Sequence, residues 1–211
     1  MGRTMKNPIK VISLSVFIIA VAACAVFIQK QLAASGFKKE TSRRWEEIDH
    51  FMKYSENSPF KDKSKEKFTG LKYFPPDPKY KVKATIVPIH GSEMIAIPMN
   101  DGSTEDYYRY GFAEFILKNK PHRLLLLKAV SDRYTDRLFL AFSDGTSGRV
   151  TYGGGRYIDL YQEAEDWVMI DFNMAYNPYC VYNISYICPL PPAENHMQVD
   201  VRAGEKIYLH E

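Results

Sequence analysis

The stretch RLFLAFSDGTSGRVTYGGGRYIDL, residues 137–160, contains short β-rich runs separated by glycine-rich turns. The runs are 137–142, 149–152 and 156–160, and the turns between them are 144–148 and 153–155. Glycine supplies the backbone angles that tight turns require, and Asp, Ser and Thr support such turns with local hydrogen bonds. Because no helix fits between runs this close together, the pattern favours antiparallel strands over a βαβ sheet.

Similar runs occur along most of the chain beyond residue 60, and turn signals such as Asn100–Ser103 separate them. They lie at residues 68–74, 80–88, 93–99, 107–117, 123–130, 167–172 and 198–202. Many short strands joined by close turns are typical of an all-β domain. We therefore predict a mostly β domain over residues 61–211, built as an antiparallel barrel or sandwich.

An uncharged apolar segment, VISLSVFIIAVAACAVFI at residues 11–28, precedes this domain. At a rise of about 1.5 Å per residue it is nearly long enough to cross a bilayer core. Arg3, Lys6 and Lys10 precede the segment, and such charges usually remain in the cytoplasm. We expect residues 1–30 to form one transmembrane signal anchor that holds the domain on the extracytoplasmic side of the cell membrane.

Two other interpretations of the N-terminal segment stay open. The small residues 21–23 precede Cys24, as in a bacterial lipoprotein signal whose cysteine is acylated, although the apolar run continues beyond Cys24. Alternatively, the segment is an ordinary secretory signal that is cleaved. A lipoprotein or a secreted protein would, like the anchored form, place the domain in the cell envelope or outside it.

Residues 31–60 are predicted to form a linker and a short amphipathic helix. The helical pattern covers 41–54, where Thr41 or Ser42 can provide the N-cap. Its apolar positions share one face: Trp45, Ile48, Phe51 and Met52. This face is expected to pack on the β domain or to stiffen a stalk.

The segment DFNMAYNPYCVYNISYICPLPPAEN, residues 171–195, mixes polar, cysteine and proline residues as core strands do not. Its prolines exclude a central strand or a helix interior, so it must be an irregular loop, and such loops commonly carry binding groups. We predict that it binds a small polar ligand or an envelope partner. The candidate ligand-binding residues are Arg156, Asp171, Asn173, Tyr176, Asn177, Glu194 and Asn195.

An enzymatic alternative uses the same loop. Asp171 or Glu194 could serve as acid-base groups of a hydrolase, with or without a metal ion. In a purely structural alternative, the loop is a folded plug whose Asp and Asn side chains brace nearby backbone. Arg156 is expected to pair with Asp171 or Glu194, because a buried cation needs an opposite charge. The sequence identifies no catalytic residue or cofactor.

Cys180 and Cys188 enclose a short loop that a disulfide could close in an oxidising compartment. Two buried thiols or a reactive redox pair are the other interpretations. Together with His196, the two cysteines could also form a zinc-binding set with an open fourth position, although their spacing matches no standard zinc motif.

The charge pattern argues against nucleic acid as a partner. The formal net charge is +3, from 28 Lys and Arg against 25 Asp and Glu, and the basic residues are dispersed among the acidic ones. A nucleic-acid interface would need a basic patch or stripe. The lysine-rich stretch 61–67 also contains acidic residues and is expected to be a solvated loop.

Four motifs give the chain a resemblance to a known family. They are TYGGGR at 151–156, DFNMAYNPYC at 171–180, CPLPPAEN at 188–195 and AGEK at 203–206. With these motifs the chain resembles the bacterial and archaeal domain-of-unknown-function family numbered 1684, over about residues 41–207. The resemblance implies no particular activity, cofactor or ligand.

Overall fold

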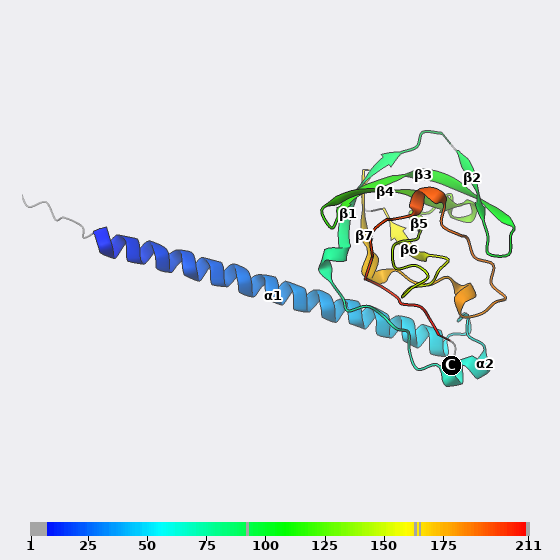
Figure 1. Cartoon of the computed structure of the whole chain (residues 1–211), viewed down its shortest axis with the longest axis horizontal. Coiled ribbons are helices and arrows are strands. Elements are labelled where there is room, and N and C mark those ends of the chain that lie inside the picture. The colour runs from blue at the N-terminus through cyan, green and yellow to red at the C-terminus, as the bar shows by residue number, and fades with distance from the viewer. Residues whose placement is uncertain (1–7, 92, 163, 165, 210–211) are drawn as a thin grey trace, which may run out of the picture.

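The computed structural model describes residues 8–91, 93–162, 164 and 166–209, and shows a long helix attached to a β domain (Figure 1). The helices are α1 (Pro8–Tyr54) and α2 (Asp62–Lys67). The strands are β1 (Lys81–Pro88), β2 (Met94–Pro98), β3 (Thr104–Leu117), β4 (Lys120–Ala129), β5 (Arg137–Phe142), β6 (Arg156–Tyr161) and β7 (Trp167–Asp171). Single-turn 3-10 helices lie at Pro78–Tyr80, Val130–Asp132, Phe172–Met174, Tyr179–Val181 and Ala193–Asn195.

The strands form one seven-stranded antiparallel sheet in the order β6-β5-β4-β3-β1-β7, and β2 pairs with β3. The sheet curls into a nearly closed barrel, whose two end strands, β6 and β7, approach each other (Figure 1). The predicted class, a mostly β antiparallel barrel preceded by an apolar helix, is therefore confirmed.

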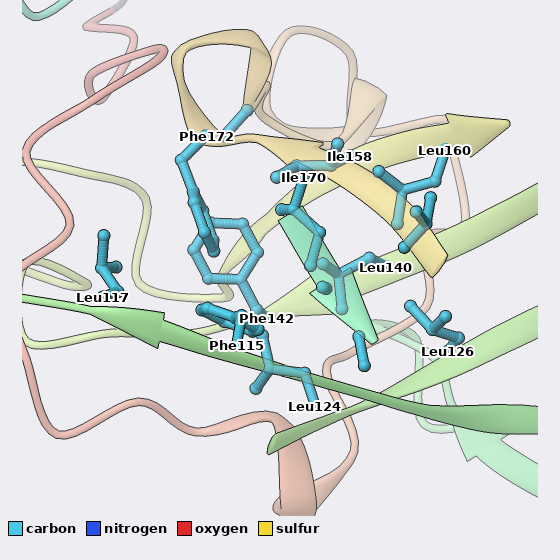
Figure 2. Packing of buried hydrophobic residues seen from close by; sticks show 14 of the residues in the cluster. Phe115, Leu117, Leu124, Leu126, Leu140, Phe142, Ile158, Leu160, Ile170 and Phe172 are labelled. Carbon is cyan, nitrogen blue, oxygen red and sulfur yellow. The ribbon is translucent and has the colours of Figure 1, made fainter. Parts of the chain in front are cut away.

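The barrel is filled by aromatic and aliphatic side chains from opposite strands. Phe115, Phe142 and Phe172 meet in its centre, and the Phe142 and Phe172 rings lie 5.3 Å apart edge to face (Figure 2). The run Leu124–Leu127 on β4 is buried throughout because both faces of the sheet are covered there. Two of these leucines point into the barrel and two into a second cluster with Ile97 and Tyr107.

Three predicted strands are absent from the described residues. The segments 68–74 and 149–152 make only single bridges, and 198–202 makes none. In the last segment, the backbone N–H of Val201 donates to a side chain, the Asp144 carboxylate, at 3.1 Å. An alternating pattern of apolar and polar side chains therefore does not produce a strand where the backbone hydrogen-bonds to side chains instead of a neighbouring strand. The expected loop in 61–67 instead contains α2.

Helix α1 is continuous through the expected linker. Thr41 does not cap a new helix, because its hydroxyl donates to the Phe37 carbonyl one turn earlier, at 2.9 Å. Trp45 anchors the C-terminal half of α1 to the β domain: its indole donates to the Asn173 carbonyl at 3.1 Å and stacks on Tyr73 at 4.3 Å. The predicted apolar face thus packs on the domain.

The N-terminal half of α1 extends away from the β domain (Figure 1). Its large apolar side chains from residue 19 to residue 28 are exposed, for example Ile19 at 68% and Phe27 at 63%. By length and composition the helix is a candidate membrane span, and none of its apolar window is buried within the protein. The side chains before residue 19, in the first part of the predicted anchor, lie outside the described set.

Candidate functional site between helix α1 and strands β6 and β7

The predicted site residues do not surround one cavity. One group is fully buried and hydrogen-bonded inside the protein: Arg156, Asn173, Asn177 and Asn195. The other group reaches the surface at two places: Asp171 and Tyr176 line one groove, and Glu194 lies elsewhere. The structural interpretation of loop 171–195 therefore holds for the buried residues, and a ligand could contact only the others.

Arg156 is a structural residue, and the expectation that it pairs with Asp171 or Glu194 was wrong. Its Nη2 donates to Asp144 Oδ2 at 2.9 Å, and both side chains have no exposed surface. The same guanidinium donates to backbone carbonyls of the C-terminal segment, including Val201 at 2.9 Å. Burial lowers the pKa of Arg156, and the Asp144 charge opposes this effect.

Asp144 in turn organises the DGTSG turn. Its Oδ1 accepts hydrogen bonds from the backbone N–H and the hydroxyl of Thr146, both at 2.7 Å. The same oxygen accepts from the N–H of Val201. Asp144 thus joins the turn, β6 and the C-terminal segment, a role that its place in a turn motif did not reveal.

Glu205, within the AGEK motif, binds the loop from the other side. Asn177 donates to its carboxylate with its backbone N–H at 2.9 Å and with its side-chain amide at 2.8 Å, and Tyr182 donates through its hydroxyl. Burial raises the pKa of Glu205 to about 7, although these donors and the nearby Arg156 charge favour the ionised form. Sequence patterns did not single out Glu205, because its partners lie far away in the chain.

The side-chain amides of two buried asparagines hydrogen-bond to backbone groups that no neighbouring strand pairs with. Asn195 accepts from Leu125 N–H at 2.6 Å and donates to the carbonyls of Leu125 and Ala141, where β4 and β5 are not directly paired. Asn173 makes the same two-way contact with Asp77, at 2.9 and 3.0 Å. An amide side chain can do this because it carries the same donor and acceptor as a peptide group.

A surface groove of about 700 Å³ lies between α1 and the space separating β6 from β7, which we call the β6–β7 seam. Helix α1 forms one wall with Ile48, Phe51 and Met52, and the edge of β6 lines the groove along residues 158–161. The remaining lining side chains come from β1, β7 and the loop after it: Lys81, Met169, Asp171, Met174, Tyr176 and Tyr179. Arg44 and Glu47 of α1 complete it.

The two groove carboxylates of the β domain, Asp159 and Asp171, differ in their partners. Asp159 on β6 accepts from the Tyr176 hydroxyl at 2.9 Å and pairs with Arg137 at 2.9 Å. Oδ1 of Asp171 accepts two hydrogen bonds from Asn173, while its Oδ2 lies 3.9 Å from Lys81 Nζ, too far for a hydrogen bond. Burial and the Asp159 charge raise the pKa of Tyr176, so its hydroxyl stays protonated and donates.

Glu194 lies outside the groove. Its side chain is 42% exposed and lies 3.7 Å from Arg109, which also binds Glu93. Asp171 and Glu194 therefore belong to different surfaces. The groove residues that sequence patterns missed, Asp159 and those of α1, come from elements far from loop 171–195 in the chain.

Cys180 and Cys188 lie against each other as free thiols, and Cys188 Sγ accepts a hydrogen bond from the Cys180 backbone N–H at 3.2 Å. The Cys180 thiol lowers the pKa of Cys188 to about 7 by donating to it. A disulfide between them stays a prediction. His196 is bound instead to Ser143 at 3.0 Å, and among the described side chains no three potential ligands gather around one metal position. The structure therefore does not bring the three residues of the predicted zinc set together.

Comparison with known proteins identifies the family of the chain. The family model described as "Protein of unknown function (DUF1684)" matches residues 66–206, so the chain belongs to this family. A solution NMR structure of an uncharacterized protein from Haloarcula marismortui is 31% identical, with a TM-score of 0.66. The match covers 84% of this chain and 97% of the other. No curated protein matches.

The Arg156–Asp144 pair leads to a first prediction. Asp144→Ala should cost about 3–5 kcal/mol of unfolding free energy, because it leaves a buried guanidinium without its counter-charge. In a double-mutant cycle, Arg156→Met and Asp144→Ala should show a coupling of at least about 1 kcal/mol, whereas Arg156→Met and Asp171→Ala should add within about 0.5 kcal/mol. Urea unfolding of the detergent-solubilised chain, followed by tryptophan fluorescence, measures both; additivity of Arg156 with Asp144 would contradict the assignment.

Glu205 predicts a pH dependence. Because its pKa rises from 4.5 to about 7 on folding, its contribution to stability is complete below pH 4.5 and is lost as the pH rises through 7. Between these values the unfolding free energy should fall by up to about 1.4 kcal/mol per pH unit. Glu205→Gln should flatten this slope, and the exposed Glu194→Gln should not. Equal slopes in wild type and Glu205→Gln, measured by urea unfolding, would refute the assignment.

Proposed function

We propose that this chain is a membrane-anchored binding domain of the cell envelope, whose ligand occupies the groove between α1 and the β6–β7 seam. The observation that carries the proposal is that two of the predicted ligand-binding residues, Asp171 and Tyr176, line this one groove. Its volume of about 700 Å³ lies within the range of known ligand sites, roughly 300–1,000 Å³.

The lining also has the composition of a ligand site. Most of it is apolar, and Met52, Met169 and Met174 bring flexible thioether side chains that adapt to different ligand shapes. A few polar groups, among them Asp171 and the Tyr176–Asp159 pair, can orient a ligand. This combination supports binding of a small ligand with both apolar and polar parts.

The exposed apolar half of α1 supports membrane attachment. Exposed side chains such as Val26 and Phe27 are costly in water and find a suitable medium in lipid. Because α1 continues unbroken into the domain, Arg44 at the groove lies roughly 24 Å along the helix axis from Ile28, at about 1.5 Å per residue. The groove would therefore open to the aqueous space above the membrane.

The hydrolase alternative has weaker support. General acid-base chemistry usually needs a second group near the first, and Glu194 belongs to another surface than Asp171. The other carboxylates in the groove are Asp159, whose oxygens are occupied by Arg137 and Tyr176, and Glu47, which pairs with Arg43 on α1. Binding therefore accounts for the groove better than catalysis.

The anchor predicts a topology. Protease added to spheroplasts should digest the β domain of the full chain, because the positive residues before the apolar segment keep only the N-terminus inside. A cytoplasmic marker protein in the same sample should remain intact. Protection of the β domain until the membrane is broken would disprove the proposed orientation.

The groove predicts selective binding of an apolar probe. With the full chain in nanodiscs, 8-anilinonaphthalene-1-sulfonate should show a saturable fluorescence increase beyond that of empty nanodiscs. Met169→Trp should remove this component by filling the groove, whereas Ile116→Trp, at an exposed β3 residue outside it, should not. If both variants match the wild type, the groove does not bind the probe and the proposed site is wrong.

A further inference from the structure

The edge of β6 that faces the groove has free backbone groups. On its other edge β6 pairs with β5. Tyr157 forms a two-bond bridge with Tyr176 on the groove side, at 2.9 and 3.0 Å. Because successive residues of a strand present their N–H and C=O to opposite edges, those of Asp159 and Tyr161 point to the same side as Tyr157. The next residue agrees with this alternation, because the Gln162 N–H points to the opposite edge, where it donates to the Asp136 carbonyl beside β5.

Strand β7 does not satisfy these groups. Its neighbour on one side is β1. The Asp166 carbonyl accepts from Ile86 N–H and therefore faces β1. Because successive residues of a strand direct their backbone groups to opposite edges, those of Met169 face the seam. Within the described residues, no backbone hydrogen bond joins β6 to β7. Tyr176 takes the position beside Tyr157 that a closing β7 would occupy.

The free backbone groups therefore lie inside a groove that already has apolar walls. Residues 158–161 of β6 line the groove, and the N–H groups of Asp159 and Tyr161 have no partner among the described residues. An unpaired strand edge is a template for another extended chain, which gains main-chain hydrogen bonds there and side-chain contacts in flanking pockets.

The shape and charge of the groove restrict the occupant. Helix α1 forms a wall of the same groove, so the sheet of a folded partner has less access to the β6 edge than a single strand. The cations Arg44 and Lys81 face the carboxylates Glu47 and Asp171, and the third carboxylate, Asp159, is already paired with Arg137, so neither a polyanion nor a polycation is favoured. The free edge, residues 158–161, is about 13 Å long at about 3.3 Å per residue.

We propose that the groove binds a short, near-neutral peptide with apolar side chains, which adds to the free edge of β6 as an extra strand. This inference rests on the proposed function, because it names the ligand class of the same groove. Apolar side chains of the peptide would contact Met169 on one side and Phe51 on α1 on the other. Hydrogen bonds to Asp159 and Tyr161 would set its register.

Tyr161→Pro tests the backbone contact directly. Proline removes the N–H that faces the groove while leaving the contacts of β6 with β5, and an edge position tolerates it. Tyr161→Ala is the matched control, because it removes the same side chain but keeps the N–H. The probe is a capped tetrapeptide of alternating valine and threonine, titrated calorimetrically into the full chain in nanodiscs with empty nanodiscs subtracted.

Binding to Tyr161→Pro should be about tenfold weaker than to Tyr161→Ala, the loss expected for one main-chain hydrogen bond together with steric exclusion. Two N-methylated peptides, one methylated at residues 1 and 3 and the other at residues 2 and 4, define two registers. Only one of the two should bind about tenfold more weakly, because only alternate N–H groups face β6. Equal binding by Tyr161→Pro and Tyr161→Ala, or equal loss in both registers, would overturn strand addition.

The naphthalene-sulfonate experiment separates this inference from the proposed function. If the groove binds that probe but no peptide binds the wild-type chain, the peptide proposal fails and the binding site stands. If Tyr161→Pro loses the naphthalene-sulfonate signal as well, the variant has damaged the groove, and the N-methylated peptides on the wild-type chain then decide the question. If neither probe binds the wild-type chain, both proposals fail together.

Discussion

The buried guanidinium of Arg156 is the contact on which the rest of the β domain depends. It holds Asp144 and the carbonyls of Val201, Ala203 and Glu205 together in the buried interior. A buried cation persists only where such partners surround it, so β6, the turn after β5 and the C-terminal segment must be in position at the same time. This network, together with single backbone hydrogen bonds such as Gly145 N–H to the Val199 carbonyl, fixes the C-terminal segment to the barrel without a β ladder.

The same segment also fixes the chain next to the groove. Through Glu205 it binds Asn177 and Tyr182, which fixes the chain just after Tyr176. Tyr176 can then pair with Tyr157 and occupy the position where β7 would otherwise close the barrel. A polar network in the interior therefore accounts for an open seam at the surface.

The strands were predictable because their signals are local. The runs for β5 and β6 lie between glycine-rich turns, and their predicted bounds agree with the structure to within one residue. The run 198–202 has similar alternation but is no strand, because its backbone bonds to side chains brought from elsewhere.

The site was less predictable for the same reason. Nothing in loop 171–195 itself distinguishes Asp171, which lines the groove, from Asn173, which is buried against residue 77. Only the fold brings α1 to β6 and makes that difference.

Helix α1 has two roles, and each constrains the other. Its apolar N-terminal half is a candidate membrane span, and its C-terminal half is a wall of the groove fixed by Trp45 and by the hydrogen bond from Leu71 N–H to Asp49. Since no break separates the halves, the groove cannot reorient freely relative to the helix. A membrane-inserted α1 would therefore hold the groove at a set height above the lipid, where a ligand arrives from water. This geometry favours a water-soluble ligand such as a short peptide over a lipid that stays in the bilayer.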